Sequence, residues 1–208
     1  MGSAFYTLTS FLAKKTSPGT ASLIAAIVFV FILVQNIEAN ETYYFKPDYT
    51  RILREVYGLN PFPEAWEISS VLKNRTKEGD IIGVLGAEPQ VFIYTGRRGP
   101  SPHDMAILLY GGAGIRSQEW QDAYIADVEK AKPQYFVCFN NQISLWSDVT
   151  DPKLFRWFQD YMAKYYELEG IADTVGPFET HYVWDDKVPA YPIKEKDPVV
   201  YVFKRKSA

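Results

Sequence analysis

The sequence predicts an α/β fold: a layered sandwich with a mixed, partly parallel sheet, preceded by one transmembrane helix. Three observations support this fold class. A long uncharged apolar segment lies near the N-terminus, and helix-like and strand-like segments alternate through the remainder of the chain. Two short segments, "IIGVL" and "YFVCF", are apolar on both faces, as in the strands of a parallel sheet. The 208 residues suffice for one domain with a sizeable core and an additional segment.

The apolar segment, Thr16 to Ile37, contains no charged residue and is long enough to cross a bilayer, which takes about 20 apolar residues. Two lysines precede it and glutamates follow it, so the positive-inside rule predicts a cytoplasmic N-terminus and an extracytoplasmic C-terminal domain. A cleaved signal peptide and a buried core helix are the alternatives. The sequence "IEA" before Asn40 is a poor cleavage site, because its first two residues are not small.

These features divide the chain into four parts: a cytoplasmic stub (1–17), a transmembrane helix (18–37), a juxtamembrane linker (38–60) and an extracytoplasmic α/β domain (61–208). The stub is fairly apolar, as the end of an earlier membrane segment would be. In the linker, Tyr43, Tyr44 and Phe45 suit an interfacial aromatic belt, or else pack against the domain.

Three amphipathic helices are predicted in the domain. The first begins near Pro63, the second covers Gln118 to Lys132 and is stopped by Pro133, and the third begins at Pro152 with Asp151 as its N-cap. Their apolar faces comprise Ala65, Ile68, Val71 and Leu72; then Trp120, Tyr124 and Val128; and finally Phe155, Phe158, Met162 and Tyr165.

Strands are predicted at "IIGVL" and "YFVCF", and at "HYVWDD" and "VVYVFKRK", which a proline-rich loop connects. In "IIGVLGAEPQVFIYTGRRG", Ile81 to Gly99, we expect a strand, a turn and a second extended segment. The predicted core comprises Ala65, Ile68, Leu72, Val84, Phe136, Val137, Phe158 and Val202.

Composition excludes several functional classes. Aromatic residues make up 16% of the chain, which is too many for a disordered protein, and the net charge of −3 gives no electrostatic basis for nucleic-acid binding. The one cysteine, Cys138, lies inside an apolar strand, so we expect neither a disulfide nor a reactive thiol. With two histidines and no EF-hand pattern, no metal or other cofactor is predicted, although a site made of carboxylates stays open.

Known phosphate-binding and nucleophile motifs do not fit. In "GVLGAEP" the two glycines have the wrong spacing for a dinucleotide fingerprint. The glycines at Gly111, Gly112 and Gly114 precede a helix with Ser117 as its cap, but no Lys-Ser/Thr follows, so a flexible loop is expected. The nucleophile elbow, G-x-S-x-G, is absent from the sequence.

One geometric expectation remains. Ligands of open α/β sheets bind at the carboxyl ends of the strands. "GAEP" follows one predicted strand and "NNQISLW" follows another, so Glu88, Asn140, Asn141 and Trp146 are expected to share one edge of the sheet as a candidate substrate-binding site.

Two further side-chain groups are candidates for chemistry. Arg97 and Arg98 could clamp a phosphate or carboxylate, or one of them could form a salt bridge with Glu88. Glu88, Asp104 and Asp148 could supply a carboxylate pair for glycosidic hydrolysis, or be hydrogen-bonded or solvated loop residues.

Four segments carry a resemblance to a known family: Asn60 to Ala65, Gly86 to Gln90, Tyr94 to Arg98 and Lys130 to Val137. Following aromatics and a membrane helix, they resemble the C-terminal extracytoplasmic domain of GT-C-type membrane glycosyltransferases, in particular bacterial relatives of the dolichyl-phosphate-mannose protein mannosyltransferases. The resemblance runs from about Tyr43 to Lys204.

The resemblance implies an accessory or acceptor-facing domain and its membrane anchor. In that family a many-helix core binds a polyprenyl-phosphate sugar and carries the catalytic carboxylate in an early extracytoplasmic loop. That loop has no counterpart here, so no catalytic residue is transferred to this sequence, and Glu88, Arg97 and Arg98 become architectural.

The partners expected on this basis are membrane lipid, a polyprenyl-phosphate sugar or glycan acceptor, and a separate multi-span membrane protein. Two other functions remain open: a membrane-tethered module that binds a glycan or a partner protein, and a tethered hydrolase that uses Glu88 with Asp104. Exposed Trp and Tyr rings would favour the module, and a carboxylate pair facing a cleft would favour the hydrolase.

Overall fold

The computed structural model describes residues 2–45, 48–104, 116–141, 144, 152–193 and 198–207. The chain forms two compact units, Met1–Ile52 and Leu53–Ala208. The second unit therefore begins inside the segment that the sequence assigned to a linker. Asp151, Trp146, Asp148 and the three loop glycines lie outside the described residues.

The first unit is helical, with α1 (Gly2–Ala13), α2 (Pro18–Ala39) and α3 (Glu41–Phe45). α2 begins at Pro18, and the hydroxyl of Ser17 caps it by accepting a hydrogen bond from the backbone N–H of Thr20 at 3.2 Å. At 1.5 Å per residue, the 22 residues of α2 extend about 33 Å, slightly more than the apolar thickness of a bilayer.

The apolar side chains of α2 are mostly exposed. Leu23, Ile27 and Phe31 are each at least 60% exposed, and the buried residues of the helix are the small Ala21 and Ala25. α1 packs on α2, and alanines four residues apart leave room for such close packing. α2 is thus long and apolar enough to cross a membrane, and its exposure argues against a core helix.

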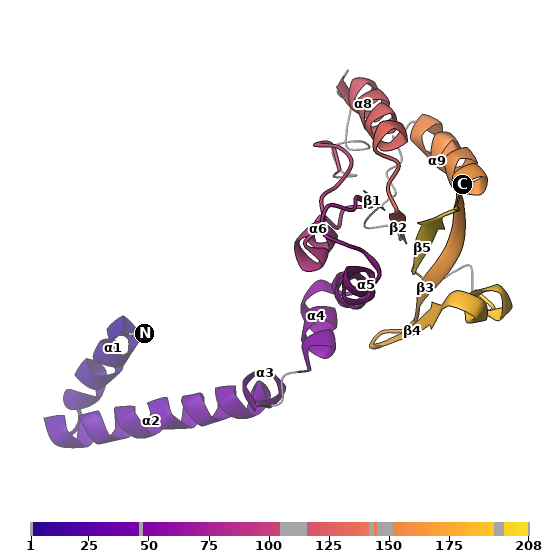
Figure 1. Ribbon diagram of the computed structural model, residues 1–208. Coiled ribbons are helices and arrows are strands. Elements are labelled where there is room, and N and C mark those ends of the chain that lie inside the picture. Colours follow the sequence, from indigo (N-terminus) through magenta and orange to yellow (C-terminus); the bar gives the residue numbers. More distant parts are fainter. Residues whose placement is uncertain are drawn as a thin grey trace. The chain divides into compact units, whose positions relative to one another are not determined.

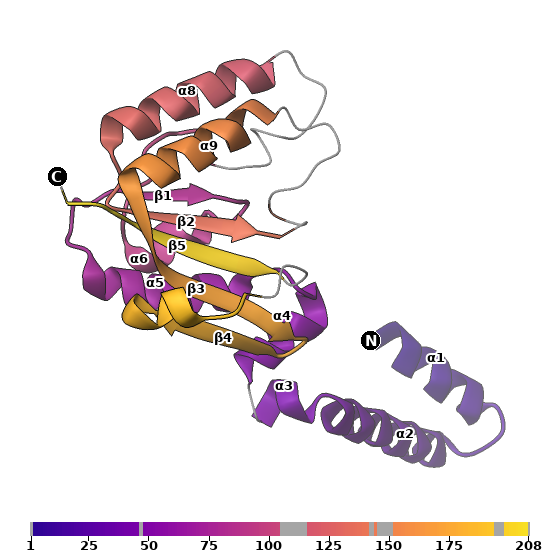
Figure 2. The same ribbon diagram turned by 90° about the vertical axis from the view of Figure 1, so that its right-hand side faces the viewer.

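The second unit contains a five-stranded mixed sheet among its described residues. In chain order the elements are α4 (Tyr49–Tyr57, which the boundary between the units divides), α5 (Phe62–Arg75), β1 (Ile82–Leu85), α6 (Gln90–Thr95), α8 (Arg116–Ala131), β2 (Tyr135–Asn140), α9 (Pro152–Tyr165), β3 (Tyr166–Gly176), β4 (Glu179–Trp184), the 3-10 helix η1 (Asp185–Ala190) and β5 (Val199–Arg205). The strand order is β1-β2-β5-β3-β4, which Figure 2 shows from top to bottom. β1 and β2 are parallel, and the other neighbouring strands are antiparallel.

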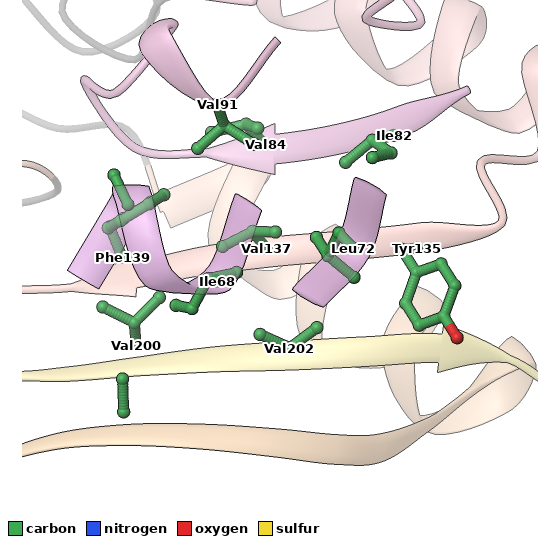
Figure 3. Close-up of a cluster of buried hydrophobic side chains, with 12 residues drawn as sticks. Ile68, Leu72, Ile82, Val84, Val91, Tyr135, Val137, Phe139, Val200 and Val202 are labelled. Atoms are coloured by element: carbon green, nitrogen blue, oxygen red, sulfur yellow. The ribbon is translucent and has the colours of Figure 1, made fainter. Parts of the chain in front are cut away.

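Helices cover both faces of this sheet, which confirms the predicted layered α/β sandwich (Figure 1). α5 and α6 pack on one face, where Ile68 and Leu72 lie over Val137 of β2 and Val202 of β5 (Figure 3). α8 and α9 pack on the other face through Tyr124 and Phe158. All eight predicted core residues are buried, at 0–7% exposure.

The first glycine of "GVLGAEP" has a packing role. A Cβ atom on Gly83 would lie 2.3 Å from the ring of Phe136, which belongs to the neighbouring strand β2. Glycine at this position therefore makes room for an aromatic ring in the core, and no phosphate is needed to account for it.

One predicted element has the wrong type, and several others were not predicted, among them α4, which lies in the segment assigned to a linker, and strand β3. The segment after Pro89 is the short helix α6 instead of an extended strand, and it ends at Gly96, whose φ of 67° is left-handed. β3, the longest of the described strands, was missed because its sequence "YELEGIADTVG" lacks a clear apolar alternation.

The apolar helix faces agree with the structure in most positions. The exceptions Val71, Trp120, Phe155 and Tyr165 are half-buried. In α9, Leu154 and Tyr161 are buried in the core instead. The predicted strands "HYVWDD" and "VVYVFKRK" correspond to β4 and β5.

Candidate functional site

The carboxyl ends of β1 and β2 meet at one edge of the sheet, because these two strands are parallel. Glu88 follows β1, Asn140 is the last residue of β2 and Asn141 comes next. The Ser144 hydroxyl donates a hydrogen bond to Oε1 of Glu88, and the Ser144 backbone N–H donates to Oδ1 of Asn141 at 2.7 Å. Ser144 thus connects Glu88 with Asn141, while the side chain of Asn140 is only half-buried.

Burial dominates the electrostatics of this edge. Glu88 is 2% exposed, and desolvation raises its pKa to about 7, although the hydrogen bond from Ser144 opposes the shift. Its Oε2 atom has no hydrogen-bond partner within the described part of the chain. A carboxyl group with such a pKa can hold or release a proton near neutral pH.

Cys138 lies in β2 close to this carboxylate. Its burial, together with the charge of Glu88, raises the pKa of the thiol to about 12. The thiol therefore stays protonated at neutral pH, which supports the interpretation of Cys138 as an unreactive core residue.

The two arginines do not join Glu88. Arg97 donates from Nε to the Thr76 hydroxyl at 3.0 Å and from Nη2 to the Thr76 carbonyl oxygen at 2.8 Å, and so holds the end of α5. The backbone of Arg98 bridges to Ile81 at the amino end of β1, whereas Glu88 follows its carboxyl end. The predicted salt bridge between Glu88 and one of these arginines is wrong.

The described contacts also give Glu88 and Asp104 different neighbours. The carboxyl group of Asp104 packs against Gly99, where a Cβ atom would lie 1.8 Å from its Oδ2. Burial raises the pKa of Asp104 to about 7, a backbone hydrogen bond at Ser101 lowers it, and the charge of Asp127 raises it further. No contact between the two carboxyl groups supports a hydrolytic pair within the described residues.

A second polar cluster was missed by sequence reasoning. Arg54 of α4 forms a buried ion pair with Glu64 of α5, and the Thr180 hydroxyl of β4 also donates to Glu64. Arg54 is 5% exposed and Glu64 is fully buried. The sequence placed Arg54 in the predicted linker, residues 38–60. The available signal was the position of Arg54 on the strongly amphipathic helix α4. Its partner could not be read from this pattern, because Glu64 lies ten positions away on another helix.

An aromatic pair joins α5 and α6, with Trp66 exposed and Tyr94 half-buried. The Trp66 and Tyr94 rings meet edge to face, with centroids 5.0 Å apart and planes at 76°. Trp66 is 55% exposed, and the adjacent Ile93 is 78% exposed. The other described tryptophans, Trp120, Trp157 and Trp184, are half-buried.

Comparison with known proteins identifies no relative of this chain. No protein-family model, no curated protein and no solved structure matches it. The likeness to GT-C glycosyltransferase domains therefore remains a resemblance of short sequence segments.

Proposed function

We propose that this chain is the membrane anchor and extracytoplasmic domain of a lipid-linked-sugar-dependent glycosyltransferase-like protein. In this proposal the N-terminus is cytoplasmic and the α/β domain faces the acceptor. A separate multi-span membrane protein supplies the donor site for the polyprenyl-phosphate sugar and the catalytic carboxylate.

The exposed Trp66 ring, which packs on the half-buried Tyr94, carries the acceptor-facing part of this proposal, and it favours equally the alternative of a membrane-tethered module that binds a glycan. Aromatic rings are usually buried, and a tryptophan that stays half-exposed on a helix face offers a flat apolar surface without net charge. The apolar face of a sugar ring fits such a surface, and the adjacent Glu67 and Ser70 side chains are exposed and can bond to hydroxyl groups. The apolar helix α2 on the same chain supports a location at a membrane.

The proposal predicts carbohydrate binding that depends on Trp66. Isothermal titration of the full chain in detergent micelles with short mannosides should give weak binding, which Trp66→Ala reduces about threefold to tenfold, because a packed aromatic contact contributes about 0.5–1.5 kcal/mol. Trp66→Phe should retain part of the affinity.

Val56→Ala is a suitable control, since Val56 is 64% exposed on α4 and is not aromatic. Unchanged affinity in Trp66→Ala would remove the main support for an acceptor-facing role. The topology is tested separately by protease treatment of intact spheroplasts, where digestion of the C-terminal domain is expected and its protection would contradict an extracytoplasmic domain.

A further inference from the structure

Large apolar side chains are exposed where α4 ends, close in sequence to the boundary between the two units. Tyr57 and Leu59 are 54% and 41% exposed, and Phe178, in the turn that joins β3 to β4, is 54% exposed. By contrast, none of the described large apolar side chains of α8 and α9 is exposed. Exposed apolar surface is therefore absent from these two helices and present beside the segment that connects the domain to α2.

Residues of α4 and of the β3–β4 turn surround one hollow of about 400 Å³ on this surface (Figure 2). Its large apolar lining residues are called the apolar rim below: Leu59, Val175, Pro177, Phe178 and Pro198. Arg54 is the only charged residue among the described lining residues, and its charge is balanced by the buried ion pair with Glu64. The rim is thus an apolar surface with no net charge of its own.

The connection to α2 selects lipid as the material that covers the rim. Residues 40–52 join α2 to the second unit, and at about 3.5 Å per extended residue this tether reaches at most about 45 Å. The helical segments α3 and α4 shorten it, and Tyr43, Tyr44 and Phe45 on α3 are 53–66% exposed, as is typical of the lipid–water interface. A membrane-inserted α2 therefore keeps the rim at a high local concentration near lipid, where a weak contact suffices.

We propose that the apolar rim docks on the lipid–water interface of the membrane that holds α2, with Leu59 and Phe178 inserted at the level of the headgroups. The exposed carboxylate of Glu179 follows Phe178 and opposes deeper insertion. Because the rim has no net positive charge, zwitterionic lipid is sufficient and anionic lipid adds no attraction. This inference rests on the membrane insertion of α2 and is independent of the sugar-related part of the proposed function.

The test uses the full chain in phosphatidylcholine nanodiscs with one fluorescent reporter at a time. Cys138 is buried, so a thiol-reactive NBD label attaches to the introduced cysteine of the folded chain, with unreacted parent protein as the check. Glu179→Cys places the reporter next to Phe178, and Gln159→Cys places it on the exposed side of α9 as the control. With 5-doxyl phosphatidylcholine in the disc, we expect emission about twofold weaker at position 179 and little changed at position 159.

A double variant separates lipid contact from the effect of the tether. Leu59→Ser combined with Phe178→Ser removes two exposed apolar side chains, so the fold is expected to be retained. With the reporter at position 179, this variant should lower the ratio of docked to undocked domain about tenfold, because the apolar area that lipid would cover is lost. Quenching that persists unchanged in the double variant would show that the tether alone orients the domain, and would overturn the contact.

The remaining outcomes separate this inference from the proposed function. Equal emission changes at positions 179 and 159, or none at either, would overturn the docking of the rim and leave both the anchor and the acceptor-facing role intact. Quenching at position 179 that requires added phosphatidylglycerol would overturn the assignment to neutral lipid. A chain that does not elute with the nanodiscs would overturn the membrane anchor and the docking together, whereas the sugar affinity of Trp66→Ala is measured without reference to lipid.

Discussion

Glu88 combines nearly complete burial with a pKa of about 7, compared with 4.5 for an unperturbed glutamate. Between these two values the folded chain keeps the proton and the unfolded chain releases it. The stabilising contribution of this group is therefore fully present below pH 4.5 and is lost as the pH rises through about 7. The edge of the sheet at β1 and β2 is destabilised on the alkaline side of neutrality.

This linkage predicts the effect of Glu88→Gln, which keeps the side-chain shape without an ionisable group. Urea unfolding at pH 5 and pH 8 should show a loss of stability in the parent chain that is smaller in the variant by about 2–3 kcal/mol. Asp104 has a pKa raised in the same direction, so part of the loss should persist in the variant. An identical pH dependence in both chains would mean that Glu88 is ionised in the fold at pH 7.

Gly83 is a second residue at which a small change has a calculable effect. Gly83→Ala would force the ring of Phe136 to move, because the added Cβ atom would be 2.3 Å from it. We expect a loss of about 1–3 kcal/mol in the free energy of unfolding, typical of an overpacked core. Gly176→Ala is the matched control, since its Cβ atom would have an ordinary contact of 3.8 Å with Glu179, and a similar loss in both variants would contradict the packing role.

At the scale of elements, strand β2 contributes to the cores on both faces of the sheet. Phe136 packs toward α9, with its ring centroid 5.2 Å from that of Phe158, while Val137 faces α5. Phe136→Ala should therefore lower the free energy of unfolding by about 3–5 kcal/mol in a denaturation experiment. Val56→Ala, at a 64% exposed position, is expected to change it little, and a loss below 1 kcal/mol for Phe136→Ala would contradict the burial of β2.

Two of the elements that sequence reasoning misjudged, β3 and α6, depend on distant partners or on caps. The charged Glu169 interrupts the apolar pattern of β3. In the fold, its carboxylate accepts hydrogen bonds from Tyr135 at 2.9 Å and Arg75 at 2.5 Å, and it pairs with Lys204 at 2.9 Å. Although burial opposes it, these contacts from Lys204, Arg75 and Tyr135 hold the pKa of Glu169 below its usual value. No local pattern contains these three partners.

In α6 the local propensities were misleading. The segment "QVFIYT" is rich in residues that favour strands, and its tertiary context overrides that preference. Thr95 donates a hydrogen bond to the Val91 carbonyl oxygen at 2.7 Å, and left-handed Gly96 ends the helix. Val91 is fully buried against the sheet, so the packing of this side chain stabilises the helical conformation of α6.

For the whole molecule, α2 should keep the chain in the membrane. After alkaline carbonate extraction we expect the expressed protein in the pellet, because the largely exposed apolar side chains of the 22-residue helix α2 are more favourable in lipid than in water. Val28→Asp combined with Ile32→Asp should move the protein toward the supernatant, as two central charges oppose insertion. Soluble parent protein trimmed at its N-terminus would instead identify this segment as a cleaved signal sequence.

The sequence by itself determined the features that depend on near neighbours. The length of the segment without charged residues predicted α2, and continuous apolar runs predicted β1 and β2 as buried strands. The apolar runs and the apolar faces of the helices also predicted the eight core residues, because an element packs against the core through its apolar face. The rule that ligands bind at the carboxyl ends of the strands also predicted that Glu88 and Asn141 lie at one edge of the sheet.

Tertiary structure alone decided which polar groups meet. Arg97 had two candidate roles in the sequence, and only the packing of α5 against α6 directs it to Thr76 and away from Glu88. The pairing of Arg54 with Glu64 and Thr180 joins a helix, the next helix and a strand more than 100 residues later. Such partners are chosen by the cost of leaving a buried charge or hydrogen-bonding group unsatisfied, and burial is a property of the folded chain as a whole.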